Sequence, residues 1–295
     1  MSDVKIPFVK MVGTGNDFVI VEAGSRRLAS AAVKWPAVAR AMCDRRYGVG
    51  ADGLLVLEQS HVADVRMRVF NPDGSEAEMC GNGARCVAGF IHVWKKRRGA
   101  DVSIESLGGL VRASIHGDRV RIQMPEPRDA QLDVPLKING HIRSMGFVDT
   151  GVPHVVAVVD SVDEVDVEQL GRTLRHHAAF QPRGANVNFI EPDRKQQNRL
   201  RVRTYERGVE GETLACGTGV TAAAVIHALS RAERNGAAKS QAYRIDVQAR
   251  SGEWLAVSLS VVSERGRLRA TNVTLEGPVR RICEGIFFWS GKGQR

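Results

Sequence analysis

The sequence lacks long apolar runs and is poor in aromatic residues. No stretch reaches the roughly 18 consecutive apolar residues that a transmembrane helix needs. The N-terminal segment MSDVKIPFVKMVGTGNDF contains no apolar run long enough for a secretory signal. Phe, Trp and Tyr together make up only 5% of the 295 residues. We therefore expect a cytoplasmic, globular protein that does not bind a membrane.

Positive charge is in excess but is not concentrated in one segment. A formal net charge of +9 favours contact with phosphate groups. However, the densest basic runs, WKKRRG (94–99) and RGRLR (265–269), are short, lie near expected loops and have no interleaved aromatic residues for stacking on bases. We interpret both runs as solvated surface and expect no nucleic-acid partner.

Cysteine is scarce and odd in number, which excludes two roles. Five cysteines cannot all pair within one chain, and a reducing cytoplasm would keep them as thiols. Cys80 and Cys86 have five residues between them, whereas zinc sites use roughly two to four. The neighbouring histidines His176 and His177 are adjacent in sequence and would point apart. The sequence therefore predicts neither a disulfide scaffold nor a metal site.

Apolar periodicity predicts short strands alternating with a few helices. The expected strands are 17–22, 53–58, 64–71, 102–106, 109–117, 119–127, 151–159, 185–191, 199–206, 243–249, 253–262, 267–278 and 279–289, and the expected helices are 31–48, 83–96 and 219–236. In the second helix Cys86, Val87, Phe90, Ile91 and Trp94 would form one apolar stripe.

The two halves of the chain follow the same order of elements. Each half runs through strands, a cysteine-led turn, a helix and a short meander; the two turns are MCGNGARC (79–86) and ACGTGVTA (215–222). An internal duplication is the simplest explanation. We predict one domain over residues 1–128, to which residues 279–295 return, and a second domain over residues 129–278.

A cysteine before the first turn of a helix lies where the unpaired amides and the helix dipole favour an anion. Such positions lower the thiol pKa from about 8.5 to roughly 3.5–7.5. One activated thiol suggests a nucleophile, whereas two equivalent thiols suggest a base and an acid that act on opposite faces of one carbon. That operation inverts a stereocentre without a metal or pyridoxal phosphate. The alternative is that both cysteines are small buried residues.

Several long motifs carry a resemblance to a known family. They are MVGTGNDFVIVE (11–22), DRRYGVGADGLL (44–55), NPDGSEAEMCGNGARCVA (71–88), GVPHVV (151–156), GANVNF (184–189) and RTYERGVEGETLACGTG (203–219). In these motifs the chain resembles the diaminopimelate epimerases, which are cofactor-independent enzymes of lysine and peptidoglycan precursor synthesis. The resemblance implies an α+β fold of two pseudo-symmetric domains, each a mixed barrel-like sheet around a central helix.

The resemblance also implies roles for individual residues. Cys80 and Cys216 would be the base and acid pair that interconverts L,L- and meso-2,6-diaminopimelate, with His154 and Glu206 tuning the thiols. The backbone of Gly81, Asn82, Gly217 and Thr218 would hold the reacting carboxylate. The second amino-carboxylate pole would contact Asn16, Asn71, Asn186, Glu206 and Arg207, since the arginine fork suits a carboxylate.

Three positions depart from the commoner family pattern. Val152 replaces an asparagine, Gly53 replaces a glutamine found in some relatives, and Cys283 stands where some have a tyrosine at a dimer contact. These departures leave the distal substrate contacts and a homodimer open. Without partner motifs, Cys43, Cys86 and Cys283 are expected to be packing residues.

Other functions remain to be separated from this one. An epimerase of the same fold that acts on proline, hydroxyproline or histidine would share the thiols, whereas a phenazine-type isomerase lacks both. A basic protein that binds anions, with silent thiols, represents a different class. The letters GVGADG (48–53) match G-x-G-x-x-G, but they follow an expected helix and precede a strand, the reverse of a dinucleotide-binding unit.

Overall fold

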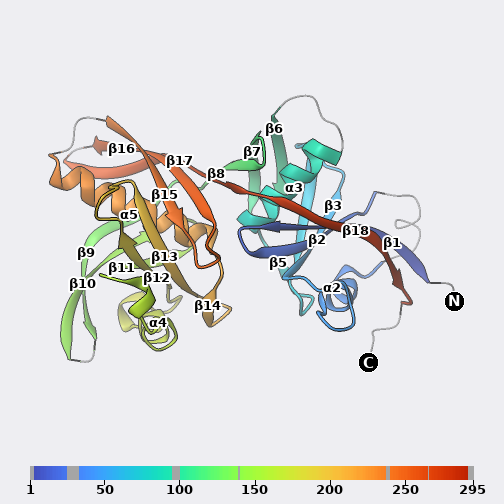
Figure 1. Cartoon of the computed structure of the whole chain (residues 1–295), viewed down its shortest axis with the longest axis horizontal. Helices are drawn as coiled ribbons and strands as arrows, with labels where there is room; N and C mark the ends of the chain where they lie inside the picture. Colours follow the sequence, from blue (N-terminus) through green and yellow to red (C-terminus); the bar gives the residue numbers. More distant parts are fainter. Residues whose placement is uncertain are drawn as a thin grey trace. The chain divides into compact units, whose positions relative to one another are not determined.

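The computed structural model describes residues 3–24, 33–94, 100–138, 140–236, 240–264 and 266–291 (Figure 1). Contacts within the chain divide it into two compact units. Unit 1 consists of Met1–Ile122 and Gly277–Arg295, and unit 2 consists of Gln123–Glu276. The boundaries expected from the sequence, after residues 128 and 278, lie slightly further along the chain.

Unit 1 is a mixed sheet with helices packed against it. Its strands are β1 (Val4–Gly13), β2 (Asn16–Glu22), β3 (Gly53–Glu58), β4 (Val65–Phe70), β5 (Glu76–Ala77), β6 (Asp101–Ser106), β7 (Gly109–His116), β8 (Arg119–Gln123) and β18 (Arg280–Trp289), and its helices in the described residues are α2 (Trp35–Cys43) and α3 (Gly81–Trp94). The strands pair in the order β18, β1, β2, β3, β4, β6, β7, β8. Pairs β2–β3 and β4–β6 are parallel, and the short β5 pairs antiparallel with the end of β4.

Unit 2 is built in the same way. Its strands are β9 (Arg128–Ile138), β10 (His141–Asp149), β11 (Pro153–Val158), β12 (Asn186–Pro192), β13 (Arg199–Glu206), β14 (Gly211–Thr213), β15 (Ser240–Gln248), β16 (Trp254–Glu264) and β17 (Arg267–Pro278). Its α-helices are α4 (Val167–Arg175) and α5 (Gly217–Arg234), with 3-10 turns η1 (Val162–Glu164) and η2 (Ala178–Phe180). Pairs β11–β12 and β13–β15 are parallel.

The pairings confirm the internal duplication. Strands β1–β8 of unit 1 correspond in order and direction to β10–β17 of unit 2, and α2 and α3 correspond to α4 and α5. Beside the first strand of each unit lies one further antiparallel strand, β18 in unit 1 and β9 in unit 2. The C-terminal strand β18 pairs with β1 within unit 1.

One helix in each unit is surrounded by strands. The helix α5 contacts β9, β10, β11, β12, β13, β15 and β16, and α3 contacts β1, β2, β4, β6 and β7. The four described residues of the predicted apolar stripe, Cys86, Val87, Phe90 and Ile91, are buried, and so is every other residue from 82 to 91. The side chain of Trp94, which that stripe included, lies outside the described set. The central-helix fold implied by the family resemblance is confirmed (Figure 1).

The first predicted helix, 31–48, is shorter in the structure. Residues 31 and 32 lie outside the described part, and α2 begins at Trp35 with Pro36 in its first turn. The helix ends at Cys43 because Asp44 leaves the helical conformation and its carboxylate accepts N–H bonds from Arg46 and Tyr47, both at 2.7 Å. The turn before Gly48, rather than Gly48 itself, therefore ends the helix.

The basic runs are only partly described, and the described arginines of the second run are exposed. Residues 95–99 and Arg265 lie outside the described part of the chain. Arg267 and Arg269 are exposed on β17, and Arg269 pairs with Glu264 at 3.1 Å. Among the described helices, none combines the length and the apolar character needed to span a membrane.

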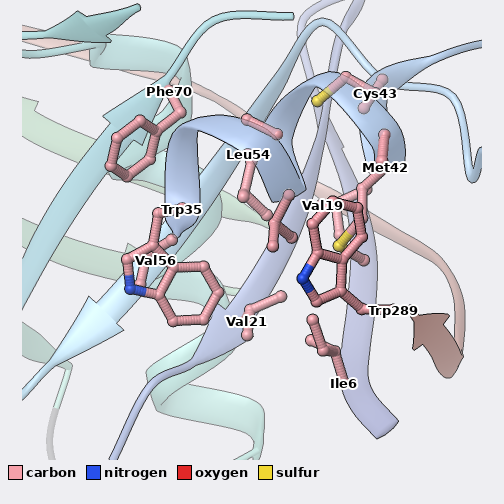
Figure 2. Packing of buried hydrophobic residues seen from close by; sticks show 14 residues of the cluster. Ile6, Val19, Val21, Trp35, Met42, Cys43, Leu54, Val56, Phe70 and Trp289 are labelled. Atoms are coloured by element: carbon pink, nitrogen blue, oxygen red, sulfur yellow. The ribbon is translucent and has the colours of Figure 1, made fainter. Parts of the chain in front are cut away.

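The core of unit 1 explains why the C-terminal strand stays in place. Ile6 of β1, Val19 and Val21 of β2, Met42 of α2 and Trp289 of β18 belong to one buried cluster (Figure 2). Trp289 is 6% exposed, although it is the last residue of its strand. Its neighbour Phe288 points to the opposite side of the strand and is 57% exposed.

Replacing Trp289 by alanine tests this anchoring role. We expect Trp289→Ala to lower the free energy of unfolding by about 3–5 kcal/mol, because it removes a large buried side chain. The matched control Phe288→Ala should cost less than about 1 kcal/mol. Both values come from denaturant unfolding followed by circular dichroism. Equal losses in the two variants would show that β18 is not anchored through Trp289.

Candidate active site

Each cysteine-led turn forms the start of a central helix. Cys80 directly precedes α3, and Cys216 is the N-cap of α5 in extended conformation. In both helices the cysteine carbonyl accepts the first helical hydrogen bond, from Ala84 N–H and Val220 N–H, each at 2.8 Å. The structure therefore confirms that both thiols lie at helix N-termini.

The two sulfur atoms have different surroundings. The Gly83 N–H donates to Cys80 Sγ at 3.4 Å, so a backbone amide of the first turn points at this sulfur. Cys216 Sγ lies 3.3 Å from the hydroxyl of Thr218 and has Glu206 as a second side-chain neighbour. Cys216 is 7% exposed, whereas Cys80 is only partly buried. At Cys80 a helix amide can stabilise a thiolate directly, whereas the neighbours of the Cys216 sulfur are a hydroxyl and a carboxyl group.

The polar residues around α3 form a connected chain in unit 1. Asn82 Nδ2 donates to Asn16 Oδ1 at 2.5 Å, and Asn16 Nδ2 donates to Asp52 Oδ2 at 3.1 Å. The Arg85 Nη2 donates to Asn82 Oδ1 at 2.6 Å and to Thr14 Oγ1 at 2.9 Å. Two predicted substrate contacts, Asn16 and Asn82, are thus brought together, and the orientation of each amide is fixed.

Arg85 is a buried residue of this chain of hydrogen bonds that the sequence reasoning missed. Its side chain is fully buried and is among the largest such side chains in the protein. It also donates to the carbonyl of Pro278 at 3.2 Å. A buried guanidinium is costly unless it is well bonded, so its place in the turn indicates a role in holding Asn82. The available signal was a charged residue within the predicted apolar helix 83–96.

Asn71 lies in the turn that follows β4. Its Nδ2 donates to Ser75 Oγ at 3.0 Å, and its backbone N–H donates to the Ser75 carbonyl at 2.9 Å. Asn71 is exposed, in contrast to Asn16 and Asn82. These hydrogen bonds of Asn71 therefore lie within the turn that follows β4.

In unit 2, Glu206 ends β13 beside the second thiol. Burial raises the pKa of the Glu206 carboxyl, and the adjacent side chains of Thr213 and Cys216 oppose that shift in part. A carboxyl with a raised pKa next to a thiol can exchange a proton with it at low cost. The structure therefore brings Glu206 and Cys216 together, as their predicted roles require.

Asn186 and Arg207 also meet in unit 2. The Arg207 backbone N–H donates to Asn186 Oδ1 at 2.7 Å, which fixes the orientation of this amide. Asn186 is 3% exposed. Thr218 is held through its carbonyl, which accepts from the buried Thr150 hydroxyl at 3.0 Å.

His154 is fully buried at the start of β11. Its ring contacts two amides of β12, with Asn188 Nδ2 lying 3.1 Å from Nδ1 and Asn186 Nδ2 lying 3.5 Å from Nε2. Burial, together with the positive charge of Arg207, lowers the pKa of His154 to about 3. His154 is therefore a neutral imidazole at physiological pH. Asn188, which the sequence reasoning missed, is the residue that contacts its Nδ1.

The other three cysteines divide into two kinds. Cys43 and Cys86 are buried, and burial raises the pKa of each thiol to about 12, so both are inert packing residues as predicted. Cys283 is exposed on β18, so the prediction that it is a packing residue is wrong. The preceding strand residue, Ile282, is exposed as well, because this strand lies at the surface of unit 1.

Gly53 and Val152, which depart from the commoner family pattern, lie in different surroundings. A Cβ on Gly53 would lie 3.2 Å from the Phe70 carbonyl oxygen and 3.3 Å from the Phe18 ring, so the start of β3 leaves little room for a side chain. Val152 is half-buried in the turn before β11, where its carbonyl accepts from Thr150 N–H at 3.1 Å. The segment GVGADG follows α2 and ends at Gly53, the first residue of β3, so it leads from a helix into a strand, the reverse of a dinucleotide-binding turn.

Comparisons with known proteins agree with this geometry. The family model described as diaminopimelate epimerase matches residues 8–128 and 146–263. A diaminopimelate epimerase of Aquifex aeolicus is 38% identical over 286 residues, which cover 94% of this chain and 96% of the relative. One of Methanothrix thermoacetophila is 38% identical over 294 residues, 96% of each protein.

Solved structures share the fold at low sequence identity. A probable proline racemase from Agrobacterium radiobacter superposes with a TM-score of 0.66 at 16% identity, covering 95% of this chain and 92% of that structure. At this identity the likeness concerns the fold alone.

The buried neutral His154 predicts a pH-dependent stability. Its folded pKa lies below the unfolded value of 6.5, so its contribution is complete above pH 6.5 and is lost as the pH falls toward 3. Between about pH 7.5 and about pH 5 this loss amounts to about 2 kcal/mol. Denaturant unfolding of the wild type and of His154→Gln at both pH values isolates the effect, because every other group is common to both proteins. The same pH dependence in both proteins would contradict a neutral His154.

Proposed function

The chain belongs to the diaminopimelate epimerase family, and we propose on this basis that it interconverts the L,L and meso forms of 2,6-diaminopimelate. The proposed reaction is a cofactor-independent epimerisation that serves lysine and peptidoglycan precursor synthesis. The observation that carries it is the pair of thiols at equivalent helix N-termini of duplicated units. A binding protein with silent thiols would not need that arrangement in both units.

The proposed chemistry is a proton transfer by two cysteines. One thiolate removes the proton from the α-carbon and becomes a thiol, while the other thiol gives its proton to the opposite face and becomes a thiolate. The configuration is inverted, and no net proton is gained or lost. The reverse reaction exchanges the two roles.

The surroundings of the two sulfurs favour one resting state. Cys80 Sγ accepts the Gly83 N–H at 3.4 Å, which suits a thiolate. Cys216 has the Glu206 carboxyl beside it, which suits a thiol that donates to a carboxylate. We therefore assign the resting thiolate to Cys80 and the resting thiol to Cys216.

The substrate contacts follow from the same units. The amides of Gly81 and Asn82 and those of Gly217 and Thr218 are proposed to hold the reacting carboxylate, because helix N-termini bind anions. The second pole of the substrate is assigned to Asn16, Asn71, Asn186, Glu206 and Arg207. An arginine and several amides match a carboxylate with an amino group beside it, whereas proline has no second carboxylate.

Three sequence-based expectations stay predictions. They are the cytoplasmic location, the homodimer, and the absence of a bound cofactor from the reaction.

Isotope exchange tests the reaction directly. The purified protein, incubated with L,L-diaminopimelate in D₂O, should yield meso product with deuterium at the α-carbon, because the donor thiol exchanges with solvent. Proline, hydroxyproline and histidine, each tested in parallel, should gain no α-deuterium. Absence of both meso product and α-deuterium would reject the proposed activity, and turnover of one of the other amino acids alone would reassign the substrate.

Replacing single cysteines tests the roles of the thiols. We expect Cys80→Ala and Cys216→Ala each to lower kcat by at least about 100-fold, the lower end for loss of a general acid or base. The matched control is Cys283→Ala, which removes an exposed thiol of β18 and should keep wild-type turnover. A Cys80 or Cys216 variant that keeps wild-type kcat would contradict the two-thiol mechanism.

A further inference from the structure

A buried amide connects His154 to the helix that carries Cys216. Asn188 lies on β12, two residues after Asn186, and is fully buried. The strands β11 and β12 are parallel with His154 opposite Asn186 in register, which brings Asn188 to the same face as the imidazole. Asn188 lies within the motif GANVNF (184–189), but the family resemblance implies no role for it.

The partners of Asn188 fix which of its atoms faces which neighbour. Its Nδ2 donates to the Val155 carbonyl at 3.0 Å, and its Oδ1 accepts from the Thr204 hydroxyl at 3.0 Å. A backbone carbonyl can only accept a hydrogen bond, so the NH₂ group of Asn188 must point toward Val155. The same NH₂ group lies 3.1 Å from His154 Nδ1.

The orientation of Asn188 determines the tautomer of His154. A neutral imidazole has one N–H donor and one bare nitrogen that accepts. Because Asn188 presents a donor to Nδ1 at a normal hydrogen-bond distance, Nδ1 is the bare nitrogen and the proton sits on Nε2.

The contact at the other nitrogen is weaker and does not compete. Asn186 Oδ1 accepts the Arg207 N–H, so its NH₂ group is the part that faces Nε2, at 3.5 Å. A neutral ring cannot accept at both nitrogens, and 3.5 Å is at the limit of a hydrogen bond. The shorter contact, to Asn188, therefore decides the tautomer.

Asn188 is also fixed from the side of α5. A Cβ on Gly219, in the first turn of α5, would collide with Asn188 Oδ1 and would lie 3.2 Å from Thr204 Oγ1. The same Cβ would lie 3.3 Å from Cys216 Cβ. Glycine at this position therefore lets the helix N-terminus rest against the Asn188–Thr204 pair.

We propose that Asn188 is a positioning residue that holds His154 in the neutral form with its proton on Nε2. In this form Nε2 already carries a proton, so this nitrogen is not a base that takes a proton from a thiol. Its bare nitrogen, Nδ1, accepts the hydrogen bond from Asn188. The catalytic consequence of this assignment rests on the proposed epimerase function, whereas the tautomer itself does not.

Nitrogen NMR of the wild-type protein tests the tautomer. In ¹⁵N-histidine-labelled protein at neutral pH, the His154 signals are identified as those missing from His154→Gln. We expect Nδ1 to resonate as an unprotonated nitrogen and Nε2 as a protonated one. A protonated Nδ1, or an imidazolium with both nitrogens protonated, would overturn the proposal. This result does not depend on the reaction, so it separates failure of the tautomer from failure of the proposed function.

Substitutions of Asn188 and Thr204 test how the hydrogen bonds from Thr204 through Asn188 to His154 affect turnover. Asn188→Asp keeps the shape but replaces the donor by an acceptor, so the His154 proton should move to Nδ1 and kcat should fall at least about 10-fold. Thr204→Val removes the donor to Asn188 Oδ1 and should show a smaller loss. The matched control is Thr221→Val, another buried threonine, whose hydroxyl bonds within α5 to the Gly217 carbonyl; it should keep both the tautomer and kcat.

The His154 nitrogen signals, kcat and the folded state of the variant together show whether Asn188 positions His154 or only supports the fold. If Asn188→Asp shifts the His154 nitrogen signals and lowers kcat while the protein remains folded, the positioning role is supported. If the nitrogen signals stay as in the wild type, or if they shift without any loss of kcat, the role is refuted. If Asn188→Asp does not fold, the wild-type spectrum decides the tautomer. The His154 nitrogen signals and kcat of Thr204→Val then decide the positioning role.

Discussion

The contact on which the site depends is that between a thiol and the first amides of a buried helix. Burial raises the pKa of a thiol, as Cys43 and Cys86 show, so a reactive cysteine inside a protein needs a compensating positive field. The N-terminus of a helix supplies about 0.3–1 kcal/mol, and up to about 2 in partly buried geometry. Because this gain is modest, direct donors such as the Gly83 N–H on Cys80 Sγ are also required.

The rest of each unit can be understood as support for that contact. A helix that begins at a glycine and is surrounded by strands has its first turn fixed in position, since the sheet contacts it from several sides. The duplication provides two such helices. The two turns then differ in their polar support. Arg85 binds Asn82 in unit 1, whereas at the corresponding place in unit 2 Thr221 bonds only within its helix, and the polar relay instead runs through Thr204 and Asn188 to His154.

Sequence patterns predicted the strands and helices whose apolar periodicity is regular. Strands 53–58, 199–206 and 267–278 have the predicted bounds in the structure, and the cysteine-led turns open helices as expected. Helix α4 was missed because its nine residues contain only three large apolar side chains and include Gly171. That glycine is required by packing, since a Cβ there would lie 2.5 Å from Tyr205 Cβ. Strand β9 was not predicted because its first four residues are all exposed and Pro135 lies within it, although burial alternates from Leu132 to Ile138.

In the site, too, the sequence reveals residues whose setting is local and not those whose partners lie far along the chain. The thiols were recognisable because the turn that activates them is local in sequence. Arg85, Asn188 and Thr204 were not, because most of their partners lie far along the chain: Arg85 contacts Thr14 and Pro278 besides Asn82, and Asn188 contacts His154 and Thr204. A buried polar residue in a strand has no periodic signature of its own, so only the fold reveals its partners.

The most direct measurement is the pH dependence of alkylation at individual cysteines, followed by mass spectrometry of the modified peptides. If the helix amides hold Cys80 as a thiolate, its rate should rise with a midpoint below the value of about 8.5 for a free cysteine. A midpoint for Cys80 at or above that value would show that the helix N-terminus does not activate this thiol.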